Sequence, residues 1–167
     1  MTVIGRDRPG LVESVASLVA EHGGNWLESR MSRLGGHFAG ILRVELPENS
    51  MPALITALTG LQASGLSIVV HPDQPGVPVP LARLATLDIV GHDRPGIVRQ
   101  ISHALASHGV NVEELETECA SAAMSGEPLF KARANLAIPA SASVPDLRAQ
   151  LEKIAGDLIV DITFKEV

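Results

Sequence analysis

The sequence contains one six-residue pattern twice, as GRDRPG at Gly5–Gly10 and as GHDRPG at Gly91–Gly96. The similarity extends further, because eleven of the twenty-seven residues in Gly5–Met31 are identical, without a gap, to those in Gly91–Thr117. Such self-similarity is the signature of an internal duplication. It constrains the fold strongly, since each copy is expected to form the same kind of unit.

A second block of similarity shows where the two copies differ in length. Phe38 and Pro47 match Phe130 and Pro139 at an offset of 92 residues, whereas the first block repeats at an offset of 86. The second copy therefore carries about six additional residues, which fall within Cys119–Leu129.

The segment between the copies is rich in proline and glycine. It contains the run DQPGVPVP, which interrupts regular structure and favours a short, fairly stiff linker. We therefore predict a first domain at 1–72, a linker at 73–82 and a second domain at 83–167. Domains of this size bury limited apolar surface, so we expect units to pair within or between chains, and we expect a homo-oligomer.

Each copy predicts a strand, a helix, two strands, a helix and a final strand. A short β-rich run precedes the repeated loop, and apolar residues then recur at helical spacing up to a His-Gly pair that is typical of a helix end. Pro9 and Pro95 are expected in the first turn of these helices, where the missing N–H costs nothing. Asp7 and Asp93, or Arg8 and Arg94, are expected near the caps.

The second half of each copy continues this order. Segments 25–34 and 111–120 are interpreted as strands, and 38–46 and 130–138 alternate between apolar and polar residues as half-buried strands do. A second amphipathic helix and a closing strand follow. The predicted fold class is α+β: two ferredoxin-like βαββαβ units, each a four-stranded antiparallel sheet with two helices on one face.

Composition excludes several classes of function. The 167 residues have a net charge of −6 and a pI of about 5.4, which argues against an extended nucleic-acid surface. Cys119 is the only cysteine, and no signal peptide or long apolar run is evident, so we expect a cytoplasmic protein with no membrane span. The sequence lacks the common catalytic, nucleotide-binding and metal-binding motifs. We therefore expect no enzyme activity, cofactor or metal.

The sequence resembles the ACT domain, a small module that senses amino acids. The resemblance rests on a strand, then DRPG with an apolar residue, then a helix that ends at HGGN or HGVN. A tandem pair without an attached enzyme implies a non-enzymatic regulator that binds a small amino acid, glycine or serine-like, and modulates a protein partner such as a transcriptional activator of glycine cleavage genes. The alternative is a stand-alone regulatory subunit or a fragment of an ACT-containing enzyme, such as formyltetrahydrofolate deformylase or phosphoserine phosphatase.

The resemblance also implies where an effector binds, namely between paired units, against the loop before the first helix and the start of the second strand. A helix N-terminus offers free N–H groups to a carboxylate, and an Asp or Asn oxygen beside it suits an ammonium group. The candidate ligand-binding residues are Asp7, Gly10, Asn25, Asp93, Gly96 and Asn111.

A purely structural interpretation of the loop stays open. Asp as a cap, Pro in the first turn and Gly for a tight turn would build it without any ligand. His92 replaces Arg6 in the second copy, so the two loops need not have the same function.

Overall fold

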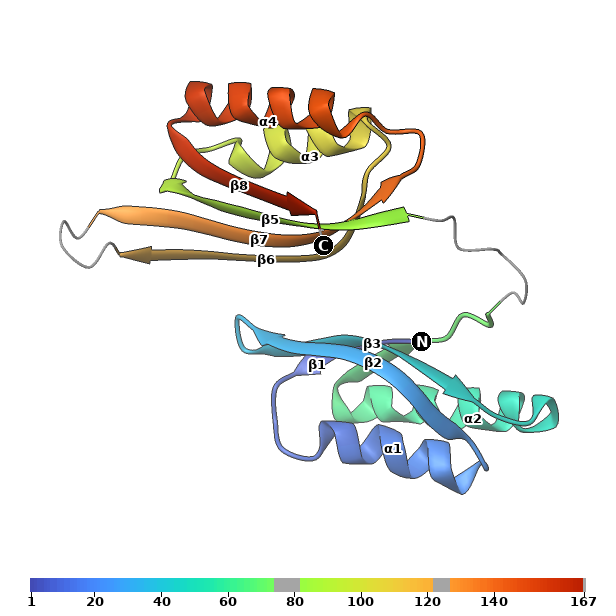
Figure 1. The fold of residues 1–167 in the computed structure, drawn as a ribbon. Coiled ribbons are helices and arrows are strands. Elements are labelled where there is room, and N and C mark those ends of the chain that lie inside the picture. Colours follow the sequence, from blue (N-terminus) through green and yellow to red (C-terminus); the bar gives the residue numbers. More distant parts are fainter. Residues whose placement is uncertain (74–81, 122–126, 167) are drawn as a thin grey trace. The chain divides into compact units, whose positions relative to one another are not determined.

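The computed structural model describes residues 1–73, 82–121 and 127–166, which form two compact units on either side of residues 74–81 (Figure 1). Nearly all of the linker predicted at 73–82 lies outside the described residues. The domain boundaries at 72 and 83 therefore stay predictions.

The first unit has the predicted order of elements, with two short 3₁₀ turns around its second helix. Its elements are β1 (Thr2–Arg6), α1 (Leu11–Glu21), β2 (Asn25–Leu34), β3 (His37–Glu45), η1 (Glu48–Ser50), α2 (Met51–Gly60), η2 (Leu61–Ser64) and β4 (Leu66–Val69).

The second unit repeats this order with longer strands. Its elements are β5 (Ala82–His92), α3 (Ile97–Ser107), β6 (Asn111–Ser121), β7 (Pro128–Pro139), α4 (Val144–Leu158) and β8 (Val160–Glu166). The additional residues of this copy belong to the connection from β6 to β7, of which 122–126 lie outside the described residues.

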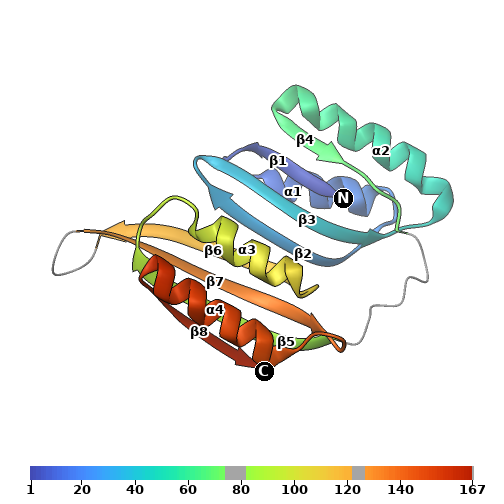
Figure 2. The same ribbon diagram turned by 90° about the horizontal axis from the view of Figure 1, so that it is seen from above.

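The strand orders β2-β3-β1-β4 and β6-β7-β5-β8 are equivalent, and all pairings are antiparallel. In each unit both helices cover the same face of the sheet, as the second unit shows with α3 beside α4 (Figure 2). The predicted pair of ferredoxin-like units is confirmed.

Apolar side chains from the helices and from the inner faces of the sheets form a separate core in each unit. Leu42 and Leu58 lie in the first core, and each is 1% exposed. Leu136 and Leu147 lie in the second core and are fully buried. Among the described residues, no polar or charged residue is buried. Burial of these side chains is the main stabilising contribution to units of this size.

Each unit has a β-bulge at the same place in its second strand. The register with the neighbouring strand shifts between Trp26 and Glu28 in β2, and between Val112 and Glu114 in β6. One additional residue at this point changes which side chains of the strand face the helices.

The helices after the repeated loops begin later than predicted. Gly10 and Gly96 are the N-caps, and α1 and α3 start at Leu11 and Ile97. The proline at position 9, like its counterpart in the second copy, thus lies in the turn before the helix. It rigidifies the loop through its fixed φ. Among the described residues, no helix is long and apolar enough to cross a membrane.

Candidate functional site

The loop between β1 and α1 is attached to the β2–β3 hairpin at the same end of the sheet. The backbone N–H of Asp7 donates to the carbonyl oxygen of Gly36 over 3.0 Å. The Asp7 carboxylate forms an ion pair with Arg33 near the end of β2, with 2.7 Å between Oδ2 and Nε. The backbone and the side chain of Asp7 therefore have separate partners.

The first glycine of the repeated pattern is required by close packing against the neighbouring strand. A Cβ atom at Gly5 would lie 2.7 Å from the carbonyl oxygen of Gly65, and one at Gly91 would overlap the side chain of Val160. Real Cβ atoms do not approach other heavy atoms so closely, so any larger residue would force the strands apart. This glycine is explained by the fold alone.

The last glycine of the pattern is required by its backbone conformation. Gly10 and Gly96 have φ values of 87° and 99°, in the left-handed region that side chains other than glycine adopt at a cost. Their carbonyl oxygens accept the first helical hydrogen bonds, from Ser14 and Gln100 at 2.9 and 3.0 Å. The loop therefore turns sharply into each helix.

The same geometry leaves backbone donors at both helix starts. Amides of a first helical turn have no partner within the helix, and Gly10 and Gly96 have no side chain with which to accept from them. In α4, by contrast, the Ser143 hydroxyl accepts from the N–H of Asp146 at 3.4 Å. The starts of α1 and α3 thus have the donors and the positive dipole end that bind carboxylates.

The two loops differ in the group that faces the aspartate. Cys119 occupies the position of Arg33 in the second copy and interacts with Asp93. Loss of hydration raises the pKa of the Cys119 thiol, and the Asp93 carboxylate, through its charge and its hydrogen bond, raises it further. Asp93 thus has a weak neutral donor, whereas Asp7 has a guanidinium.

The first turns of the two helices also differ in charge. Glu13 lies in the first turn of α1, and Arg99 takes the equivalent place in α3. A negative charge there opposes the binding of a carboxylate and a positive charge favours it. The second loop is therefore the more suitable of the two for an anionic group.

The predicted asparagines lie far from the loops of their own units. Asn25 starts β2 and pairs with Glu45, whereas β1 ends beside His37 at the opposite end of β3. Eight residues of strand correspond to roughly 26 Å. Asn111 has the same placement in the second unit. The structure thus brings Asp7 together with Gly10 but does not bring Asn25 to them.

The paired histidines at the helix ends have different contacts. His22 Nδ1 lies 2.7 Å from the carbonyl oxygen of Leu18 in the last turn of α1, whereas His108 Nε2 lies 2.9 Å from Oε1 of Gln150 on α4. Within 1–73, 82–121 and 127–166, no group of three His, Cys, Asp or Glu residues is placed to hold a metal ion. Both histidines are explained by packing between helices and by helix termination.

Arg33, Arg99 and Cys119 were not expected beside the loops from the sequence. A signal for two of them was present, because the offset of the first block aligns Arg33 with Cys119. The antiparallel hairpin then places both beside the repeated loop. The bulge that fixes which face they occupy has no clear signature in the sequence.

Comparison with known proteins agrees with this architecture. The family model described as ACT domain matches residues 1–71 and 83–124. The "Glycine cleavage system transcriptional repressor" of Escherichia coli K12 is 23% identical over 162 residues, which cover 95% of this chain and 84% of the relative. The solved structure of an unknown protein from Galdieria sulphuraria has a TM-score of 0.83 and 31% sequence identity, and the match covers 99% of this chain and 95% of that one.

The family model spans more than half of the chain and reaches into both copies of the repeat. The chain therefore belongs to the ACT domain family.

Proposed function

We propose that this chain is a cytoplasmic regulatory protein that binds a small amino acid and conveys its presence to a protein partner, without catalysing a reaction. The observation that carries the proposal is that each ACT unit retains a tight β–α loop with an aspartate beside an open helix start. The E. coli relative, named a transcriptional repressor, matches nearly the whole chain. This agrees with a regulatory function.

The ligand is a zwitterion with a small side chain, such as glycine or serine. Its carboxylate would accept from the first-turn amides of α1 or α3, and its ammonium group would donate to Asp7 or Asp93. Each aspartate lies only four residues before the first residue of its helix, and we therefore expect a ligand whose charges are one carbon apart. Gly10 and Gly96 would let the ligand approach the backbone.

The second loop is the stronger of the two candidates. Asp93 can exchange a weak thiol contact for an ammonium group, and Arg99 adds positive charge at the start of α3. At the first loop an ammonium group would compete with Arg33 for Asp7, and Glu13 would repel the carboxylate. We therefore expect the second loop to bind the amino acid more tightly.

Asn25 and Asn111 would contact the ligand only in an oligomer. Each lies too far from the loop of its own unit to share a ligand with it. An asparagine at the start of β2 or β6 would contact the same ligand only if another unit supplied the loop. The expected homo-oligomer would provide such a unit, and sedimentation of the full chain with and without glycine measures this association.

The partner is expected to be a protein such as a transcriptional activator of glycine cleavage genes. The acidic charge of the chain disfavours direct binding to nucleic acid. An amino acid that binds one conformation of the units better than another would shift the chain between partner-binding states.

Isothermal titration of the full chain with each of the twenty amino acids tests the sensor function. We expect heat with glycine or serine, loss of that heat in Asp93→Asn, and a smaller effect in Asp7→Asn. Glu152→Gln, which neutralises an exposed carboxylate on α4, serves as the charge control. No heat with any amino acid would exclude the sensor function. Wild-type affinity in both Asp93→Asn and Asp7→Asn would exclude the assignment of the ligand to these loops.

A further inference from the structure

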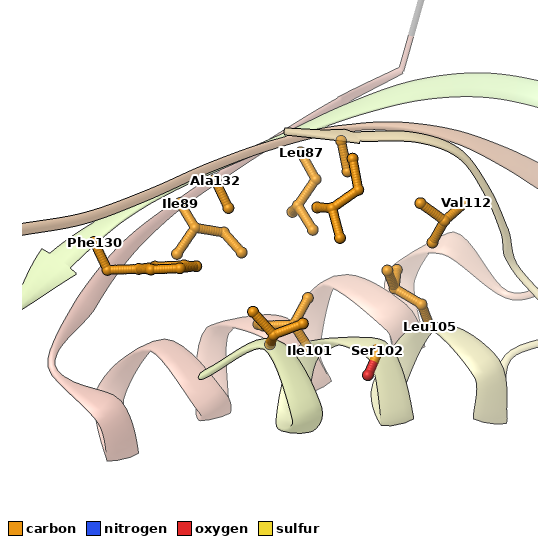
Figure 3. A pocket seen from close by; sticks show the side chains of 11 residues that line it. Leu87, Ile89, Ile101, Ser102, Leu105, Val112, Phe130 and Ala132 are labelled. Carbon is orange, nitrogen blue, oxygen red and sulfur yellow. The ribbon is translucent and has the colours of Figure 1, made fainter. Parts of the chain in front are cut away.

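The second unit contains a pocket between its sheet and α3. The pocket has a volume of about 40 Å³. Figure 3 shows that side chains from the sheet, such as Leu87 and Ile89, face Ile101 and Leu105 on α3 across it. Val98 and Leu115 are 44% and 51% exposed, and they mark the side on which the pocket opens to solvent. The complete lining is Leu87, Ile89, Val98, Ile101, Ser102, Leu105, Val112, Leu115, Phe130, Ala132 and Ala134.

The pocket wall is almost entirely apolar. Its only residue with a polar side chain is Ser102, whose hydroxyl donates to the carbonyl oxygen of Arg99 within the same helix at 3.1 Å. Figure 3 shows this oxygen pointing away from the cavity. The pocket therefore has no polar group that would hold water inside it, and an apolar group would fill it favourably.

The internal duplication explains why this space exists. Leu42, which is 1% exposed in the first unit, corresponds to Ala134 in the second. Trp26 corresponds to Val112: each immediately precedes the bulge, and they pair with equivalent residues of the next strand. At both positions a large side chain of the first unit is replaced by a small one in the second.

A third position shows the same change. Met31 lies over Gly40 in the first unit, where its Cγ occupies the space that a Cβ would take. The second unit has Thr117 and Ala132 at these places, paired in the same way. The additional methyl group of Ala132 replaces only part of the lost volume. These substitutions remove side-chain volume between the second strand and the first helix of the unit, and Leu115, which replaces Ser29 beside Ala134, restores part of it.

The first unit shows which group occupies this place. Trp26 is half-buried and packs against the first core, so part of its side chain stays in water. A cavity of about 40 Å³ is too small to enclose a ring, compared with about 150 Å³ for an engineered cavity that binds benzene. A ring that lies at the mouth of the pocket, in the place of Trp26, does not have to fit inside the cavity.

We propose that the pocket between β6 and α3 binds a small molecule with an apolar aromatic ring of the size of indole, in the position that Trp26 occupies in the first unit. The ring would contact Val98, Val112 and Leu115 and would leave its polar edge in solvent. None of the lining residues belongs to the β5–α3 loop at 93–96. This site is therefore distinct from the amino-acid site proposed above and does not depend on it.

Titration of the ¹⁵N-labelled full chain with indole, followed by NMR, tests this site. We expect saturable shifts for amides of α3 and β6, with one site per chain, and unchanged shifts for residues 92–96. Val112→Trp copies the first unit and should weaken indole binding at least about tenfold. Ala134→Leu, which copies Leu42, should have the same effect and provides a second variant if the first does not fold.

Val90→Trp is the matched control, since Val90 lies on the face of β5 that points away from the helices. It adds the same side chain but should leave the affinity for indole unchanged. The proposal is overturned if the wild-type chain shows no saturable shifts up to the solubility limit of indole. Undiminished binding in both Val112→Trp and Ala134→Leu, or shifts confined to the first unit, would overturn it as well.

Discussion

Arg33 Nε lies 2.7 Å from Asp7 Oδ2, and this ion pair joins the end of β2 to the loop that enters α1. In the second unit the equivalent aspartate, Asp93, has Cys119 as its neighbour. Two loops with the same Asp-Arg-Pro-Gly sequence therefore have different electrostatic surroundings. One carboxylate is balanced by a cation on its own unit, and the other faces a neutral thiol.

Replacing Arg33 with alanine should make the first loop more similar to the second. Both partners of the ion pair are substantially exposed, so we expect the free energy of unfolding to fall by less than about 1 kcal/mol. The ammonium group of the ligand would no longer compete with Arg33 for the Asp7 carboxylate. Calorimetry should then detect a second amino-acid site per chain. The additional site should disappear in Arg33→Ala/Asp7→Asn. Unchanged stoichiometry in Arg33→Ala would show that the ion pair does not limit binding.

Alkylation of Cys119 should report on the charge of Asp93. The carboxylate disfavours the thiolate, so its removal in Asp93→Asn should lower the pKa of the thiol and shift the pH profile of iodoacetamide modification toward lower pH. Since Cys119 is the only cysteine, mass spectrometry gives the rate directly. Asp88→Asn neutralises a carboxylate of the same unit that pairs with Arg133 instead, and its profile should match the wild type. A profile for Asp93→Asn that also matches would contradict the contact.

Alanine at the first glycine of either loop should destabilise its unit. The new Cβ would lie 2.7 Å from the carbonyl oxygen of Gly65 in Gly5→Ala and against Val160 in Gly91→Ala, so we expect a loss of about 1–3 kcal/mol. Urea unfolding followed by circular dichroism measures this loss.

Gly156→Ala provides the control for these variants. Gly156 lies inside α4, and a Cβ there would have no heavy atom within 4 Å. We expect this variant to be more stable by about 0.5–1 kcal/mol. A stable Gly5→Ala would contradict the close approach of β1 and β4.

Leu42→Ala should reproduce the small side chain of Ala134 in the first unit. Leu42 is 1% exposed, and truncation of a buried leucine costs about 2–5 kcal/mol. Trp26 is the only tryptophan, so its fluorescence follows unfolding of the first unit selectively. Ile41→Ala is the matched control, because Ile41 is 65% exposed on the other face of β3. Equal unfolding midpoints for the two variants would contradict this assignment of faces.

Much of the fold could be predicted because the duplication gave two versions of each signal. The alternation of β3 and β7 and the helix ends at the His-Gly pairs follow from local residue patterns. The starts of α1 and α3 were predicted too early, since a proline before a positive-φ glycine reads like a proline in the first turn. The placement of Asn25 away from the loop required the strand register, which the sequence does not encode locally.

The pocket could not be predicted from local patterns either. Val112 and Ala134 are ordinary strand residues. Only their placement in the pocket wall beside α3, compared with the larger Trp26 and Leu42 of the first copy, shows that volume is missing. Packing defects arise from side chains distant in the sequence. They become visible once the three-dimensional neighbours are known.

The bulge in β2 determines which charge the first loop meets. Strand side chains alternate between faces, so a regular strand that continued from Trp26 without a bulge would direct 28, 30 and 32 inward. With it, Arg33 shares the face of its partner Phe38 and reaches Asp7. Because the bulge absorbs one residue, deleting Leu27 would give a regular strand that still places Arg33 opposite Phe38. The equivalent bulge in β6 keeps Cys119 opposite Phe130, so an irregularity near the start of each second strand decides which side chain faces the aspartate at its far end.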